Sequence, residues 1–97
     1  MRTVQLRRYE IKPGEMDAFV AAWRGVVPVR EQYGFTVAFA VIDRVQNEFV
    51  WAVTHVGDFA SAEQAYYGSP ERAALPANPA DHIAVAHVEL VEPLLLP

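Results

Sequence analysis

The stretch of residues 4–14, VQLRRYEIKPG, constrains the fold of this chain more than any other. It alternates with the two-residue period of a β-strand and ends at Pro13 and Gly14, which break a strand and favour the start of a helix. One parity reads Val4, Leu6, Arg8 and Glu10, and the other reads Gln5, Arg7, Tyr9 and Ile11. Both parities mix apolar and charged side chains. We therefore expect a strand over residues 3–11 that is covered on both faces.

The pattern of the remaining chain predicts the elements that cover this strand. Apolar residues at helical spacing predict a helix over residues 15–33, with a kink near residues 24–27 because Pro28 falls inside it. Strands are predicted over residues 35–43, 48–56 and 82–92, a helix over residues 59–67, and a short helix that starts at Ser69. This order is βαββαβ. It indicates one α+β, ferredoxin-like domain over residues 1–97, with an antiparallel sheet of strand order 4-1-3-2 and its helices on one face.

The strands over residues 35–43 and 48–56 each show a bulky face and a small face. Small side chains let a helix pack close to a sheet, so we expect the small face beneath the helices. The bulky face then needs another cover, and stacking it on a second copy of the chain is the simplest one. This predicts a homodimer whose interface contains Phe39, Phe49, Trp51, Val53 and Val85.

Composition excludes several classes of protein. The net charge is −4, the chain has a single lysine, and its arginines are scattered, so nucleic acid is not an expected partner. There is no cysteine, hence no disulfide and no thiolate metal site. No apolar run reaches the roughly 18–20 residues of a membrane span, and the first residues lack the apolar core of a signal peptide. These features predict a cytoplasmic protein without membrane partners.

The histidines do not predict a metal site. His82 and His87 are five residues apart on a strand and therefore face opposite sides. His55 and His87 share a parity, but the strand between them holds them about 10 Å apart. We expect no metal and no other cofactor.

Two sets of polar residues are candidates for a site. The first is catalytic and lies on the bulky face, where Arg7, His55 and Glu89 are expected to converge; its members are Arg7, Tyr9, His55, His87 and Glu89. It is either an Arg7–Glu89 ion pair with a hydrogen-bonded histidine, or a pocket with a histidine base. The second is a ligand pocket on the helix side, with candidates Arg8, Glu10, Trp23, Thr54 and Tyr66.

The opening stretch also resembles the start of NIPSNAP-family domains. Those domains begin with a Leu-Arg-x-Tyr-x-hydrophobic-Lys-Pro-Gly pattern, which residues 6–14 match, and Ser69-Pro70-Glu71 is similar to a later Asp-Pro-Glu segment of the family. At Arg72 the chain differs, because the family usually has tryptophan there. The resemblance implies a dimeric α+β barrel, in which the sheets of two subunits close into one barrel. It implies no defined set of catalytic residues.

Two functions remain open at this point. The first is a homodimeric barrel of uncharacterised function that binds a small hydrophobic molecule or serves a structural role. The alternative, which the superfamily resemblance implies, is a cofactor-independent monooxygenase-like enzyme acting on a hydrophobic aromatic or polyketide-type substrate. A reachable cavity between sheet and helices that holds a titratable group would favour the enzyme.

Overall fold

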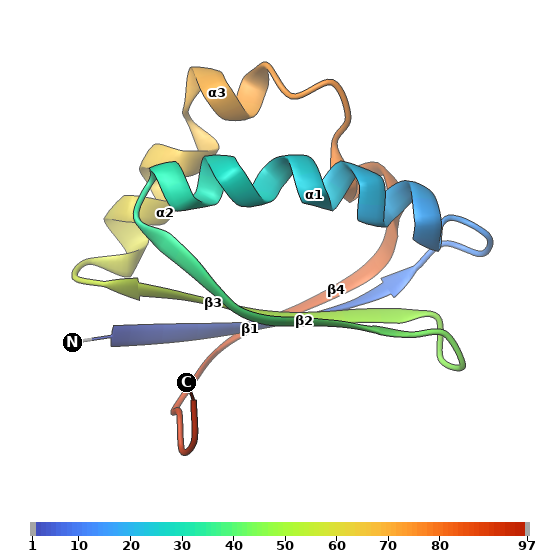
Figure 1. The fold of residues 1–97 in the computed structure, drawn as a ribbon, viewed down its shortest axis with the longest axis horizontal. Helices are drawn as coiled ribbons and strands as arrows, with labels where there is room; N and C mark the ends of the chain where they lie inside the picture. Colours follow the sequence, from blue (N-terminus) through green and yellow to red (C-terminus); the bar gives the residue numbers. More distant parts are fainter. Residues whose placement is uncertain (1, 97) are drawn as a thin grey trace.

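The chain folds into a four-stranded antiparallel sheet with helices on one face (Figure 1). The structure is a computed structural model that describes residues 2–96. The elements in order are β1 (Arg2–Ile11), α1 (Met16–Gln32), β2 (Phe35–Asp43), β3 (Glu48–Val56), α2 (Phe59–Tyr67), α3 (Pro70–Ala73), the 3-10 helix η1 (Pro79–His82) and β4 (Ile83–Val91). The sheet order is β2-β3-β1-β4, which is the predicted order read from the other edge. The ferredoxin-like α+β fold is therefore confirmed, with β1 in the interior of the sheet.

Local sequence explains where the helices begin. Gly14 has a φ of 77°, a left-handed conformation that glycine adopts without strain, in the turn from β1 to α1. Asp58 caps α2, because its carboxylate accepts a hydrogen bond from the backbone N–H of Ser61 at 3.1 Å. Ser69 caps α3 and is followed by Pro70 at the first helical position. Pro28 lies within α1, which continues through it as one helix.

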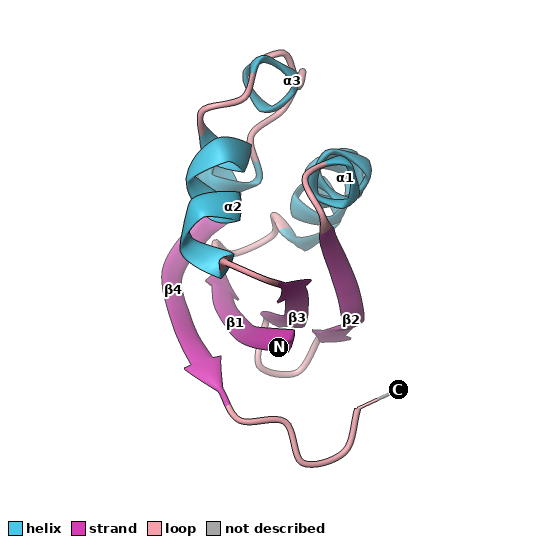
Figure 2. Cartoon of the chain, turned by 90° about the vertical axis from the view of Figure 1, so that its left-hand side faces the viewer, coloured by secondary structure: helices cyan, strands magenta, loops and turns pink. Residues whose placement is uncertain are grey.

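The side chains of β1 with odd numbers point toward the helices. Tyr9 is paired in the sheet with Phe49, and Arg7 with Trp51. The ring of Phe19 from α1 packs edge-on against Tyr9 and Phe49, with centroid distances of 5.7 and 4.8 Å. The hydrophobic core therefore lies between this face of the sheet and the helices. Figure 2 shows the helices over one face of the sheet.

This arrangement corrects the predicted assignment of the faces. Phe49, Trp51 and Val53 were expected to meet a second subunit, but all three are buried beneath the helices of their own chain. The expectation was wrong because the helix–sheet layer is where this chain can bury most apolar area, and its large rings fill that space. Phe39 and Val85, in contrast, lie on the other, open face of the sheet.

Two β-bulges explain why simple alternation failed for parts of the sheet. In β2 the register shifts between Val37 and Phe39, so Phe39 pairs with Ala52 and turns to the open face. In β4 the register shifts at Ala84, because Glu10 pairs with Val85 while Ile11 pairs with Ile83. An extra residue in a strand reverses which side chains point inward and which point outward from that position on. The hydrophobic pattern of β2 gives no sign of this residue.

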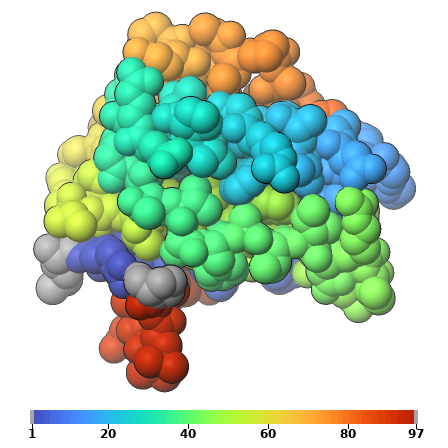
Figure 3. Space-filling model, viewed as in Figure 1, coloured from blue at the N-terminus to red at the C-terminus, as the bar shows by residue number. Residues whose placement is uncertain are grey.

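The open face is partly apolar and carries two pairs of polar side chains. Val41, Val56 and Val85 are among its exposed side chains. Arg8 donates to Glu48 at 3.1 Å, and the imidazole Nε2 of His87 lies 2.9 Å from a carboxylate oxygen of Glu10. After β4 the chain passes to the same side of the sheet and projects from the body, with Leu94 and Leu95 almost fully exposed (Figures 1, 2 and 3).

No helix among residues 2–96 is long and apolar enough to cross a membrane.

Candidate functional site

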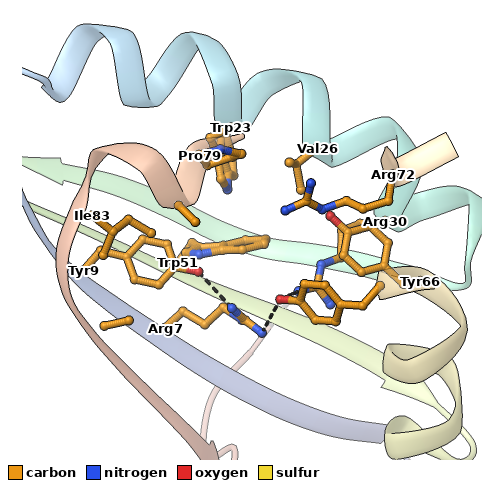
Figure 4. A pocket seen from close by; sticks show the side chains of 13 residues that line it. Arg7, Tyr9, Trp23, Val26, Arg30, Trp51, Tyr66, Arg72, Pro79 and Ile83 are labelled. Atoms are coloured by element: carbon orange, nitrogen blue, oxygen red, sulfur yellow. Dashed lines mark hydrogen bonds between the residues drawn. The ribbon is translucent and has the colours of Figure 1, made fainter. Parts of the chain in front are cut away.

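A cavity of about 210 Å³ lies between the helix-facing side of the sheet and the helices (Figure 4). Its walls come from β1, β3, β4, all three α-helices and η1. The lining residues are Arg7, Tyr9, Trp23, Val26, Arg30, Trp51, Tyr66, Tyr67, Arg72, Pro79, Ala80, Ile83 and Ala86. The lining combines aromatic rings with three arginines and contains no histidine or carboxylate. It is therefore an apolar space with an excess of hydrogen-bond donors.

Two of the arginines share one carboxylate. Arg7 from β1 and Arg30 from α1 each donate a hydrogen bond to the same oxygen, Oε2, of Glu63 at 3.1 Å. Their side chains are 10% and 2% exposed, so both charges are largely removed from water. Burying a guanidinium is costly unless an anion and hydrogen-bond acceptors surround it. Glu63 supplies one negative charge for the two positive ones.

Tyrosine hydroxyls complete the surroundings of these two arginines. Arg7 donates to the hydroxyl of Tyr9 at 2.9 Å, and both Arg7 and Arg30 donate to the hydroxyl of Tyr67, at 3.2 and 3.1 Å. Burial acts against the charge of Arg7, but the two tyrosines and the glutamate outweigh it, so the pKa of the guanidinium is raised above its ordinary value. Arg7 is therefore a fixed positive charge at the floor of the cavity.

Arg72 is the third arginine and reaches the cavity from α3. Its guanidinium donates to the side-chain oxygen of Asn78 at 3.2 Å and lies 5.9 Å from the ring centres of both Tyr66 and Tyr67. Burial raises the pKa of the Tyr66 phenol above its ordinary value, so this side chain stays neutral at physiological pH. The surroundings of Arg72 are thus polar or aromatic, but not anionic.

Four buried side-chain nitrogens without a hydrogen-bond partner occur among residues 2–96, and all four belong to cavity-lining residues. They are the Nε1 atoms of Trp23 and Trp51 and the Nε atoms of Arg30 and Arg72. More than nine in ten buried polar groups in folded proteins have a partner. The unpaired donors among residues 2–96 are thus concentrated on residues around one cavity.

The structure brings together only part of each predicted site. Arg7 and Tyr9, predicted as catalytic candidates, and Trp23 and Tyr66, predicted as pocket residues, all line the one cavity. The other members lie elsewhere: Arg8, Glu10, Thr54, His87 and Glu89 are on the open face.

The predicted convergence of Arg7, His55 and Glu89 is wrong. Glu89 pairs with Leu6 in the sheet and therefore faces away from Arg7, whose carboxylate partner is Glu63. The Nδ1 atom of His55 is 3.0 Å from the carbonyl oxygen of Gly34, and its ring packs against Phe35 and Phe59 outside the cavity. His55 therefore has a structural position.

Sequence reasoning missed Arg30, Glu63 and Arg72. A signal existed for Arg30, which lies four residues after Val26 on the apolar stripe of α1, where a charged side chain must find buried partners. Glu63 lies four residues before Tyr67 on α2, so the two share a helix face. Nothing in the sequence showed that this face would meet Arg7 from β1.

The described part of the chain holds no group of three histidine, aspartate or glutamate side chains placed to bind a metal ion. The polar side chains that line the cavity are those of arginine, tyrosine and tryptophan. These groups bind and orient an acceptor, and they provide no general base of ordinary pKa near neutrality.

Comparisons with known proteins bear on the fold. No protein-family model matches the sequence, and no curated protein matches it. Solved structures do match. A NIPSNAP family protein of unknown function from Agrobacterium tumefaciens superposes with a TM-score of 0.82 at 16% identity, over 95% of this chain and 87% of that one. An uncharacterised NIPSNAP domain protein from Burkholderia xenovorans gives 0.78 at 16% identity, over 97% and 95%.

The chain has the fold of NIPSNAP-domain proteins. This confirms the α+β, ferredoxin-like fold of the single chain that the resemblance in residues 6–14 implies. The NIPSNAP fold is also shared more widely: a protein from Nitrosomonas europaea provisionally named an antibiotic biosynthesis monooxygenase matches with a TM-score of 0.74 at 14% identity, over 96% of this chain and 90% of that one. One fold thus carries proteins of different names, and the site must decide the function.

Proposed function

We propose that this chain is a homodimeric, cytoplasmic small-molecule-binding protein whose ligand occupies the cavity between sheet and helices. The observation that carries the proposal is the set of four unpaired buried nitrogens, all on cavity-lining residues. A buried donor without an acceptor costs about 1–3 kcal/mol, so a ligand whose binding shifts these side chains and lets them donate gains hydrogen bonds that the empty protein lacks.

The binding proposal is tested by filling the cavity. Ala86 lines it from β4, so Ala86→Phe places a ring inside. Ala65 is exposed on α2 and lines no part of the cavity, which makes Ala65→Phe the matched control. A thermal-shift screen with small aromatic acids, amides and amines is expected to find compounds that stabilise the unchanged protein and the control but not Ala86→Phe. Equal stabilisation of all three proteins, or of none, would contradict the proposal.

The homodimer part of the proposal is supported by the open face. The open face exposes Phe39, Val41 and Val85 on the same sheet surface as the Arg8–Glu48 and His87–Glu10 pairs. The apolar end of the chain projects on the same side. In a monomer these apolar side chains remain exposed to water, whereas two sheets stacked face to face would bury them. The cytoplasmic location is the one that the sequence predicts.

The monooxygenase-like alternative is supported by the aromatic walls of the cavity, which suit a hydrophobic aromatic or polyketide-type substrate. It is weakened by the lining itself, because no histidine or carboxylate is present to abstract a proton from a substrate. The alternative is tested by measuring oxygen uptake in the presence of phenolic polycyclic compounds, and uptake by the protein would support the monooxygenase-like function. We expect no uptake above that of buffer.

A further inference from the structure

Three arginines and one carboxylate, Glu63, surround the cavity, so its positive charges are only partly balanced, and Arg72 is the arginine without a carboxylate partner in the described part of the chain. Arg7 and Arg30 both reach Glu63, but within residues 2–96 no carboxylate lies within ion-pair distance of Arg72. Its guanidinium contacts the neutral side-chain oxygen of Asn78 and the rings of Tyr66 and Tyr67. Glu71, the adjacent acid, is turned away and accepts a hydrogen bond from the hydroxyl of Tyr33 at 2.6 Å.

Arg72 is also held in place before any ligand arrives. Its backbone N–H donates to the Ser69 hydroxyl at 3.0 Å, and that buried hydroxyl donates to the carbonyl of Tyr66 at 2.7 Å. The short helix α3 is thereby fixed to the end of α2. In Figure 4 the Arg72 side chain extends from α3 into the cavity toward Val26, above Arg30. A pre-positioned guanidinium loses little freedom when it binds an anion.

Building on the proposed binding function, we propose that the ligand is a small aromatic monocarboxylate, and that Arg72 is the residue that selects its acidic group. A carboxylate matches the planar fork of a guanidinium and supplies acceptors to a wall of unpaired donors. The indole and phenol rings of Trp23, Trp51 and Tyr66 offer faces and edges for an aromatic ring.

The size and charge of the cavity narrow this class. Pockets for drug-sized ligands measure roughly 300–1,000 Å³. The 210 Å³ found here suits about one ring with a short acidic side chain. Among the described residues, Arg72 is the one cavity arginine without a carboxylate partner, and its planar guanidinium matches the two oxygens of one carboxylate, which is the basis for choosing a carboxylate over a phosphate.

The test uses the fluorescence of the two tryptophans, since both line the cavity and the chain has no others. Phenylacetate, its neutral analogue phenylacetamide, phenyl phosphate and the uncharged ring compound indole are titrated into the unchanged protein, Arg72→Gln and Arg44→Gln. Arg44 is an exposed arginine paired with Asp17 on the surface, so its variant removes a positive charge away from the cavity.

We expect phenylacetate to bind the unchanged protein and Arg44→Gln about tenfold to a hundredfold more tightly than phenylacetamide, as is typical of a charge-assisted hydrogen bond. In Arg72→Gln this preference should fall to about twofold or less, with the affinity for phenylacetamide unchanged. Arg72→Lys should restore part of it.

The contrary outcomes separate the two proposals. Binding of indole or phenylacetamide without any preference for phenylacetate, or a preference that survives in Arg72→Gln, would overturn the selection of a carboxylate and leave the binding function in place. Tighter binding of phenyl phosphate than of phenylacetate would overturn the monocarboxylate class. Unchanged fluorescence with all four compounds would count against both proposals.

Discussion

At the scale of single residues, Glu63 holds the cavity together, because it is the one carboxylate shared by Arg7 and Arg30. Replacing one partner of a buried ion pair leaves the other charge uncompensated, and here two guanidinium groups would be left at once. Glu63 keeps 24% of its side chain exposed, which reduces this effect. We expect Glu63→Gln to lower the free energy of unfolding by roughly 2–4 kcal/mol.

Urea denaturation followed by circular dichroism measures this loss. Asp17→Asn is the control, because it also removes a carboxylate bonded to an arginine, but on the exposed surface. Its unfolding curve should superpose on that of the unchanged protein. Equal midpoints for Glu63→Gln and Asp17→Asn would show that the buried cluster contributes no more than a surface pair.

The same residues show how far sequence reasoning reaches at this scale. Arg7, Tyr9, Trp23 and Tyr66 could be singled out because polar or large side chains on predicted buried faces must have a role. Their companions could not, since an ion pair such as Arg7–Glu63 joins residues 56 positions apart. Such a pairing depends on how α2 lies over the sheet, and no spacing along the chain encodes that angle.

At the scale of elements, the cap of α2 makes a pH-dependent contribution to stability. Hydrogen bonds from the backbone and hydroxyl of Ser61 hold the pKa of Asp58 below its ordinary value of 3.8. A carboxyl whose pKa is depressed by folding stabilises the fold above its ordinary pKa and loses that effect as the pH falls through the lower, folded value. The contribution is therefore fully present at neutral pH.

Thermal unfolding of Asp58→Ala across the acid range tests this. The melting temperature of the variant should lie below that of the unchanged protein at pH 7, and the gap should close as the pH falls below 3.8. Ser69→Ala removes the cap of α3, whose hydroxyl does not titrate in this range, so its gap should remain constant. If the difference in melting temperature between Asp58→Ala and the unchanged protein stayed constant across the acid range, the charged cap would be contradicted.

The elements themselves were predicted well, and their faces were not. The boundaries of α1, β2, β3 and α2 agree with the sequence pattern to within one residue, because caps, glycines and alternation are local signals. Which parity lies beneath the helices is a long-range property. Both parities of β1 mix apolar and charged residues, so burial could not be assigned from this strand alone.

At the scale of the whole molecule, the two faces of β4 allow a matched test of the proposed homodimer. Val85 and Val88 are each 43% exposed, but Val85 lies on the open face and Val88 on the helix side. A charge at Val85 would be buried between two stacked sheets, whereas a charge at Val88 would remain at the solvent-exposed margin of its own subunit.

Light scattering after size exclusion is expected to show a dimer for the unchanged protein and for Val88→Glu, and a monomer for Val85→Glu. Circular dichroism confirms that the variants remain folded. A monomer in all three cases would refute the homodimer, and a dimer in all three would place the interface elsewhere than the open face.

The bulge in β2 has a consequence for how this molecule can vary. Because the bulge inverts the alternation after Val37, the odd-numbered residues of β2 face the helices in its first half and the open face in its second half. In the proposed homodimer, substitutions at Phe39 or Val41 are therefore expected to alter association without disturbing the ring packing around Phe35. Removing one residue at Ala38 would join the two halves into a single alternating strand and draw Phe39 back beneath the helices. The inserted residue thus lets the packing of the core and the composition of the open face vary independently, whereas an unbroken strand would couple them.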